Sequence, residues 1–226
     1  MRKDKNIALK LRREGASYRK IEQRMNIPRS TLCDWLKDES WSKKVKLQLN
    51  QAAKKRNIPR IIELNKIRGE HLEKIYQRAH KEAKNELQHF IWNPLFVAGL
   101  CLYWGEGEKI SKHHVKISNT DPLMIKIFVQ FLMKICGVGK NKIKAHLLLY
   151  PDLSPEICIP YWSKISGIEK GNFNKCVVIN GKHVTRRLKY GVCVVEISSS
   201  YLKEKINTWL TLFPSQLINN IHHTRE

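Results

Sequence analysis

The feature that most constrains the fold of this chain is an apolar run that ends abruptly in a carboxylate between two glycines. The run and its end form the segment FVAGLCLYWGEGEK, residues 96–109, and the acid is Glu106. Its length and apolar composition predict a buried helix that begins at Pro94, because proline is common at the first position of a helix. The glycines beside Glu106 predict that the helix ends there, because glycine is common where helices end. Small side chains allow a second helix to approach closely. If two such helices cross, the carboxylates at their ends meet.

Two interpretations of Glu106 are open. In the first, Glu106 is a solvated residue at the glycine-capped end of a core helix. In the second, two copies of Glu106 hold Mg²⁺ against a phosphate, because carboxylate oxygens suit this cation. The chain carries one acid of this kind, so the second interpretation requires a homodimer with a two-fold axis through the helix contact. The small residues expected at this contact are Ala98, Cys101 and Gly105.

The charge of the chain points to a polyanionic partner. Its 226 residues include 42 Lys and Arg against 20 Asp and Glu, a formal charge of +22 that is spread along the sequence. Such a balance is typical of proteins that bind DNA, RNA or an anionic membrane surface. No apolar stretch is long enough to span a bilayer, and no signal peptide opens the chain. We therefore expect no membrane partner and a cytoplasmic protein, nucleoid-associated if the source is prokaryotic.

Residues 15–37 predict a helix-turn-helix within an N-terminal domain of residues 1–50. Ser17 is a candidate N-cap for the first helix, and Asn26-Ile27-Pro28 breaks the chain before a second helix that begins near Arg29. Polar residues near the start of the second helix are placed to meet base edges. The predicted DNA contacts of this domain are Arg19, Arg29, Ser30, Thr31, Asp34 and Lys37. The stretch resembles small resolvase-like helix-turn-helix domains, and the alternative is a three-helix packing unit without a DNA role.

Residues 51–91 predict a basic helical linker. Pro59 is expected to interrupt it. From Arg60 to His89 the apolar residues recur at spacings of three to five, which makes one thin stripe on a charged helix. This pattern favours a solvated connecting helix, while packing on the next domain or pairing with a second copy are alternatives.

Residues 92–214 predict a mixed α/β domain, followed by a tail over residues 215–226, so that the fold class is α+β. Alternating side chains predict strands over 114–118, 143–150, 176–180 and 191–198. The strands should form an antiparallel sheet with one open, basic face that contacts a DNA backbone or groove. The predicted contacts of this domain are Lys116, Lys144, His146, Lys182, Arg186, Arg187 and Lys189.

The segment GLCLYWGEGEK resembles the LAGLIDADG motif of homing endonucleases. Gly105-Glu106-Gly107 matches the motif's closing Gly or Ala, acid and Gly, and Cys101 falls on its small helix-contact position. Leu102 and Tyr103 fall on its apolar positions. The resemblance implies that two motif helices pack at the centre of a dimer or pseudo-dimer, and that the sheets form a saddle over DNA. It also implies that each helix delivers one acid to the metal ions, so Glu106 would be the catalytic metal-binding residue.

Two departures from the motif bear on function. Trp104 stands where the motif often has Asp. Only residues 108–113 separate the motif from the strand at residue 114, whereas the family has a base-reading hairpin there. The shortened segment predicts reduced sequence specificity of this domain, supplied instead by the helix-turn-helix. The resemblance as a whole predicts a Mg-dependent double-strand DNA endonuclease. The alternative is a LAGLIDADG-like transcription regulator that has lost cleavage. An RNA-binding role is less favoured, because a helix-turn-helix reads duplex DNA.

Overall fold

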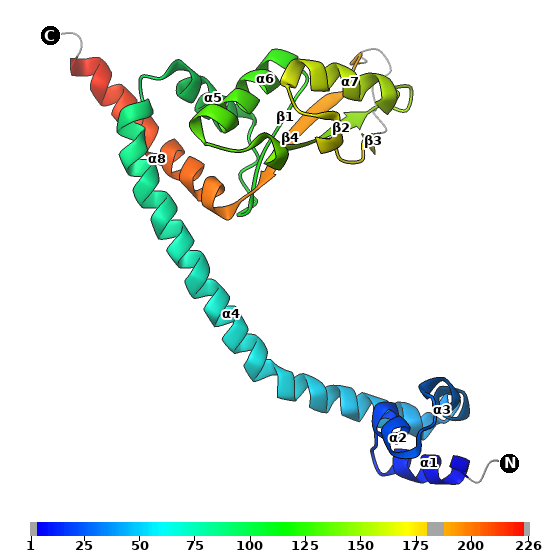
Figure 1. Cartoon of the computed structure of the whole chain (residues 1–226). Helices are drawn as coiled ribbons and strands as arrows, with labels where there is room; N and C mark the ends of the chain where they lie inside the picture. The colour runs from blue at the N-terminus through cyan, green and yellow to red at the C-terminus, as the bar shows by residue number, and fades with distance from the viewer. Residues whose placement is uncertain (1–3, 180–187, 224–226) are drawn as a thin grey trace. The chain divides into compact units, whose positions relative to one another are not determined.

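The computed structural model confirms the α+β class. It describes residues 4–179 and 188–223, with side chains described as far as residue 219. The contacts within the chain divide it into two compact units with the boundary between His71 and Leu72 (Figure 1).

The N-terminal unit contains three short helices, of which the second and third are those predicted for the helix-turn-helix. They are α1 (Asp4–Arg13), α2 (Tyr18–Met25) and α3 (Arg29–Leu36), followed by the first part of α4 (Ser40–Phe90). The Ser17 hydroxyl accepts a hydrogen bond from the Lys20 N–H and so caps α2. Asn26 ends α2 in the left-handed conformation, at φ 54°, which asparagine tolerates better than most residues. The core of this unit consists of Ala8, Ile21, Ile27 and Leu32.

A buried arginine ties α1 to the start of α4. Arg12 is only 3% exposed, and its guanidinium donates to the Ser42 hydroxyl, the Ser42 carbonyl and the Ala16 carbonyl. The same group stacks over the Tyr18 ring at 4.5 Å. Burial lowers the pKa of Arg12, although the guanidinium keeps its charge because its ordinary pKa is so high. The three helices are thus anchored to α4 by hydrogen bonds as well as by apolar packing.

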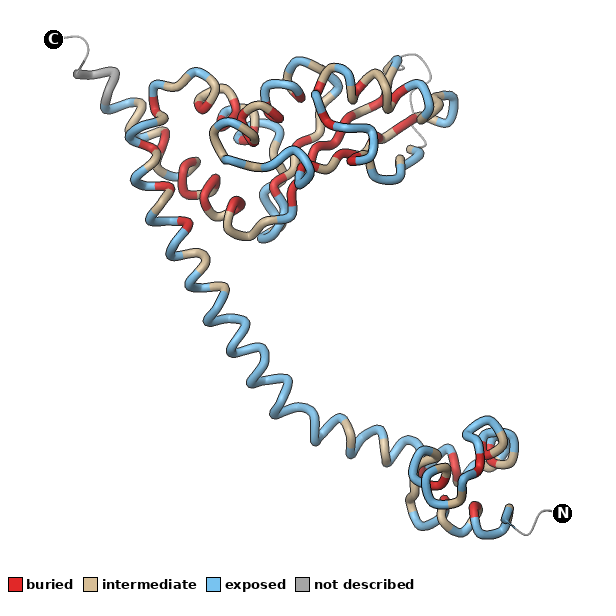
Figure 2. Tube along the Cα trace, in the orientation of Figure 1, coloured by how far each residue is buried: buried red, intermediate tan, exposed pale blue. Residues whose placement is uncertain are grey.

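Helix α4 runs without interruption from Ser40 to Phe90, so the predicted break at Pro59 is wrong. A proline inside a helix removes one backbone hydrogen bond and usually bends or breaks the helix. Residues 54–71 are all exposed (Figure 2), so water can satisfy the carbonyl that Pro59 leaves without a donor. This stretch matches the expectation of a solvated helix.

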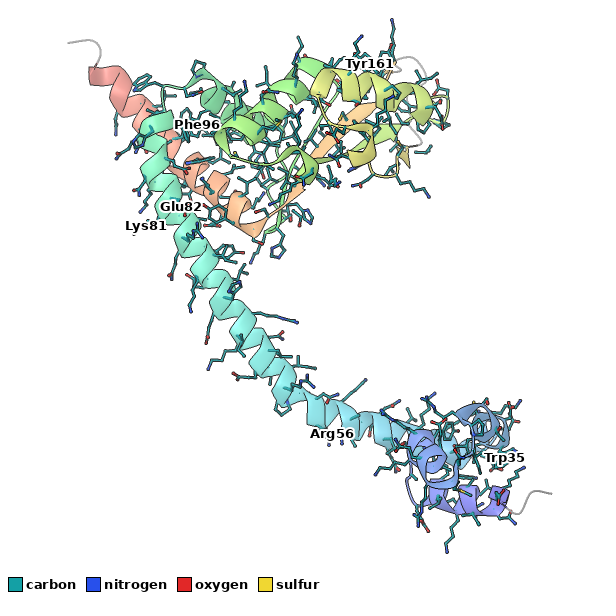
Figure 3. All side chains as sticks on the ribbon, in the orientation of Figure 1. Trp35, Arg56, Lys81, Glu82, Phe96 and Tyr161 are labelled. Atoms are coloured by element: carbon teal, nitrogen blue, oxygen red, sulfur yellow. The ribbon has the colours of Figure 1, made fainter. Side chains whose placement is uncertain are left out.

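The C-terminal part of α4 belongs to the core of the second unit. Ala79, Ala83 and Leu87 are fully buried, and Trp209 Nε1 donates to the Ala83 carbonyl at 3.0 Å. Glu82 is labelled in Figure 3; its carboxylate pairs with Arg78 and accepts a hydrogen bond from the Tyr201 hydroxyl. The alternative that the predicted linker packs on the next domain therefore holds for its last third.

The second unit is built on a four-stranded sheet with the order β1-β4-β2-β3. The strands are β1 (His114–Asn119), β2 (Lys144–Leu149), β3 (Val177–Val178) and β4 (Val192–Ser198). Three of them pair antiparallel as predicted, but β3 runs parallel to β2, so the sheet is mixed. The parallel direction follows from the connection, because α7 (Pro155–Ser166) crosses over between β2 and β3.

One face of this sheet carries the main core. Val115, Ile117, Ala145, Leu147 and Val195 are buried on it. The core is completed by α5 (Pro94–Glu106), by α6 (Pro122–Gln130) with its π-helical extension Phe131–Ile135, and by α8 (Ser200–His223), besides α7. Short 3₁₀ turns lie at Lys140–Lys142 and Lys170–Asn172. Because α8 continues through Pro214 to His223, most of the predicted tail is helical.

Candidate acid site and nucleic-acid interface

Helix α5 positions the acid, and one of its faces is fixed inside the chain. The Asn93 side chain caps the helix by accepting from the Leu95 and Phe96 N–H groups at 2.9 and 3.2 Å. Phe96 then packs edge-on against Trp209, with ring centroids 5.2 Å apart. A Cβ atom on Gly99 would lie 2.2 Å from the Phe131 ring. The close helix approach that small residues permit is therefore used at Gly99 within this chain.

The three residues predicted for a dimer contact lie on a different side of α5. Cys101 and Gly105 are exposed, and Ala98 is half-buried. A Cβ atom on Gly105 would meet no neighbouring atom within 4 Å, outside its own helix backbone. Positions separated by three, four and seven residues share one helix face. The structure thus places these three small residues on one stripe of α5, on which Cys101 and Gly105 are exposed with respect to the described residues.

Glu106 is the last residue of α5 and is exposed. The chain folds back directly after it, because Gly107 forms a bridge with Ile117 and donates its N–H to the Tyr103 carbonyl at 2.9 Å. A Cβ atom on Gly107 would lie 2.3 Å from the Tyr103 carbonyl oxygen, so this sharp return requires glycine. The glycine after the acid therefore has a steric role, and it leaves the Glu106 carboxylate at the surface.

A buried lysine fixes the chain just beyond the acid, and no pattern in the sequence had pointed to it. Lys203 on α8 is 2% exposed, and its Nζ donates to both the Tyr103 hydroxyl and the Glu108 carbonyl at 2.5 Å. The Tyr103 hydroxyl donates to the same carbonyl at 2.6 Å. Burial raises the pKa of Tyr103 and lowers the pKa of Lys203. These contacts hold the return of the chain against the start of α8.

Glu108 has a local role that differs from that of Glu106. Its carboxylate accepts from the Ile110 and Ser111 N–H groups at 2.6 and 2.9 Å. The Ser111 N–H, and after it the Ile110 N–H, lowers the pKa of Glu108. Glu108 therefore organises the short turn that leads to β1, and its carboxylate is engaged by backbone N–H groups.

Glu106 alone does not make a complete site for a divalent cation. Among the described residues, no group of three or more His, Cys, Asp and Glu side chains could hold a metal ion. Glu106 offers one exposed carboxylate, and Mg²⁺ in proteins is commonly held by one or two carboxylates together with substrate phosphates. Two copies of Glu106 and a DNA phosphate would make such a ligand set.

The open face of the sheet carries the predicted cationic residues together with an acid that the sequence analysis missed. Lys116, Lys144 and His146 all lie on this face and are half-buried. Glu196 stands between them on the central strand β4, and its Oε1 lies 3.8 Å from His146 Nδ1. The alternation of VCVVEIS over 192–198 could have placed Glu196 on the polar face.

The predicted contacts of the helix-turn-helix lie at the surface of the N-terminal unit. Arg19, Arg29, Ser30, Asp34 and Lys37 are exposed, and Thr31 is half-buried. Arg29 Nε lies 2.9 Å from the Glu22 carboxylate, which also accepts from the Arg29 N–H at 3.3 Å. Glu22 therefore caps α3 and orients the first residue of the predicted reading helix. Such an exposed pair is worth little energy, so DNA can displace it.

The remaining predicted contacts belong to the segment before β4. Lys189 is exposed in the turn that leads into this strand. Lys182, Arg186 and Arg187 lie outside the described residues.

Comparison of the chain with models of protein families, with curated proteins and with solved structures gave no match. Within residues 4–179 and 188–223, no helix combines the length and the apolar character needed to cross a membrane.

Proposed function

We propose that this chain is a DNA-binding protein that acts as a homodimeric, Mg-dependent endonuclease of the LAGLIDADG type. The observation that carries the proposal is the placement of Glu106. It lies exposed at the end of a helix on which Cys101 and Gly105 are also exposed, and a Cβ atom on the next residue, Gly107, would clash with the Tyr103 carbonyl. A two-fold contact through Ala98, Cys101 and Gly105 would bring two such carboxylates together.

Two separate surfaces support binding to duplex DNA. The N-terminal unit presents polar side chains along the first turns of α3, which is the part of a recognition helix that meets base edges. The sheet presents Lys116, Lys144 and His146 on the face opposite the one that carries the main core. The formal charge of +22 adds a general attraction to phosphates.

In phosphodiester hydrolysis, different residues of the chain would have different roles. The two Glu106 carboxylates would hold the cation, and Lys203 with Tyr103 would fix the backbone that follows each carboxylate. When bound, a divalent cation supplies an activated water and stabilises the charge of the leaving oxygen. The basic residues of the sheet would position the DNA backbone across the acid pair.

A DNA-binding regulator without cleavage is the second candidate. The structure offers one observation in its favour, since the hairpin after the motif helix is reduced to the bridge between Gly107 and Ile117. A shortened hairpin can contact fewer bases, so more of the sequence recognition would come from the helix-turn-helix.

The test compares wild type with Glu106→Gln on a randomised duplex library in the presence of Mg²⁺. The substitution keeps the size of the side chain but removes the charge that binds the cation. We expect cuts by wild type, a loss of cleavage by orders of magnitude in the variant, and unchanged or tighter DNA binding. Cuts by wild type and by Glu106→Gln at equal rates would show that the catalytic residues lie elsewhere in the chain.

The control for this test is Glu169→Gln. Glu169 is an exposed acid in the same unit, before the 3₁₀ turn at residues 170–172. The Glu169→Gln protein should therefore cut DNA like wild type. Glu108 is unsuitable as a control, because its carboxylate holds the turn at Ile110 and Ser111. Binding without cuts in wild type and in both variants would favour the regulator.

A further inference from the structure

An acidic side chain lies in the middle of the open face of the sheet. Glu196 is on β4, which is flanked by β1 and β2. The strand register places Lys116 directly opposite Glu196 on one side and Lys144 directly opposite on the other. Side chains that are directly opposite on antiparallel strands have Cβ atoms about 5 Å apart. The face therefore presents a row of ammonium, carboxylate and ammonium groups across three strands.

The flanking lysines are not the contacts that hold the Glu196 carboxylate. Lys144 Nζ donates instead to Asn172 Oδ1 at 2.7 Å. Lys116 lies near enough to Glu108 to act on that carboxylate electrostatically. Glu196 Oε1 is contacted by Asn174 Nδ2 at the longer distance of 3.3 Å. His146 Nδ1 lies 3.8 Å from the same oxygen, and the Glu196 side chain is 27% exposed, so part of it is accessible from the open face.

A carboxylate on a DNA-binding face repels phosphates, so its place there calls for a donor group on the DNA. In the major groove, the donors are the exocyclic amines of cytosine and adenine, and Glu is suited to the cytosine amine. A C·G pair presents that amine beside the O6 and N7 acceptors of guanine, which suit a lysine. A carboxylate and an ammonium on neighbouring strands match this arrangement of donor and acceptors.

We propose that Glu196 determines sequence specificity by accepting a hydrogen bond from the cytosine amine of a C·G pair, while Lys116 on the next strand donates to the paired guanine. This inference rests on the proposed function, since it takes the open face of the sheet to be a DNA-contacting face. It assigns a base-reading role to a sheet whose preceding hairpin is short.

The experiment is a binding-site selection from randomised duplex DNA with EDTA present, so that cleavage does not interfere. The full chain is used as wild type, Glu196→Gln and the control Glu169→Gln. We expect wild type and the control to enrich a site with a C·G pair at one position. Glu196→Gln should lose about tenfold of the preference at that position, and its affinity for random DNA should stay equal or rise, since a negative charge is gone.

A second variant and a folding measurement distinguish a loss of base recognition from a loss of folded protein. Lys116→Ala should weaken the preference at the same position, and far-ultraviolet circular dichroism should show all variants folded. An unchanged selected site in both Glu196→Gln and Lys116→Ala overturns this inference, and so does DNA binding by wild type without any sequence preference. No DNA binding by wild type at all would instead refute the proposed function.

Discussion

The buried ammonium of Lys203 and the hydroxyl of Tyr103 lie 2.5 Å apart, and both donate to the carbonyl of Glu108. Tyr103 is on the helix that ends in Glu106, whereas Lys203 is on the last helix of the chain. Their contact joins α5 to α8 at the residue where the chain turns back. The position of the proposed catalytic acid therefore depends on a polar contact between residues that are far apart in the sequence.

A double-mutant cycle should show strong coupling between these two residues. Tyr103→Phe leaves the Lys203 ammonium buried with one fewer partner, which costs about 1–3 kcal/mol. In a Lys203→Met background no buried charge loses a partner, so the same change should cost clearly less. Urea unfolding of wild type, both single variants and the double variant measures the coupling. Additive losses would mean that Tyr103 and Lys203 act independently.

Two glycines on the same helix should respond to substitution in opposite ways. A Cβ on Gly99 would lie 2.2 Å from the Phe131 ring, so Gly99→Ala should destabilise the fold by about 1–3 kcal/mol through overpacking. Gly105 has open space around it, and Gly105→Leu should leave the fold as stable as wild type or stabilise it, because Leu favours helix. Chemical unfolding distinguishes the two effects.

The same Gly105→Leu variant tests the proposed dimer. A large side chain in the small-residue stripe should prevent close contact between two α5 helices, so the variant should sediment as a monomer and lose cleavage. Cys101→Trp should act in the same way, because Cys101 is also exposed on that stripe. If both variants stay dimeric and active, the two-fold contact is not formed by this face.

Local patterns in the sequence were enough to predict most elements of the fold. The Ser17 cap, the break at Asn26-Ile27-Pro28 and the alternation of β1, β2 and β4 are all signals that lie within a few residues. The break expected at Pro59 did not occur, because a long helix can lose one hydrogen bond without ending. The direction of β3 depends on the connection through α7, which alternation does not reveal.

The site was less predictable, because its parts come from distant segments. The exposed end of α5 at Glu106 followed from the Gly-Glu-Gly sequence alone. The Lys203 contact joins residues about a hundred positions apart, and a lysine on a predicted amphipathic helix would normally be placed in solvent. Glu196 was readable from its strand, but its two lysine neighbours come from the register of three strands.

Arg29 and Thr31 should determine preference among DNA sequences. Replacing both with Ala should reduce discrimination between specific and random duplexes by about 1–3 kcal/mol, while the salt dependence of binding changes little. Lys37→Ala is the comparison, since a phosphate contact should weaken both kinds of binding alike and lower the salt slope by about one. Fluorescence anisotropy over a range of salt concentrations measures both quantities. Equal losses on specific and random DNA in the Arg29 and Thr31 variant would argue against a recognition helix at α3.

The stability of the second unit should fall in alkaline solution. Burial raises the pKa of the Cys193 thiol from 9.0 to about 12. Burial and, to a smaller extent, the hydrogen bond to Glu82 raise the pKa of Tyr201 from 10.0 to about 12. Above the ordinary pKa of each group the unfolded chain releases a proton that the folded chain keeps, so the free energy of unfolding decreases as the pH rises. The lowered pKa of Lys203 works in the opposite direction below 10.5 and offsets part of the loss.

Two variants separate the alkaline contributions of these groups by the pH at which each begins. Urea unfolding measured from about pH 7 to about pH 11 should show a wild-type decline that sets in near the ordinary thiol pKa of 9.0. Cys193→Ala should keep that onset but make the early decline shallower, because burial also raises the pKa of the Cys136 and Cys158 thiols, which titrate in the same range in the unfolded chain. Tyr201→Phe should keep the onset but make the decline shallower above the ordinary tyrosine pKa of 10.0. It should also lower the free energy of unfolding by a constant amount at every pH, because the hydrogen bond to Glu82 is missing. Declines in both variants that run parallel to wild type over the whole range would show that neither group is protected from titration in the folded protein.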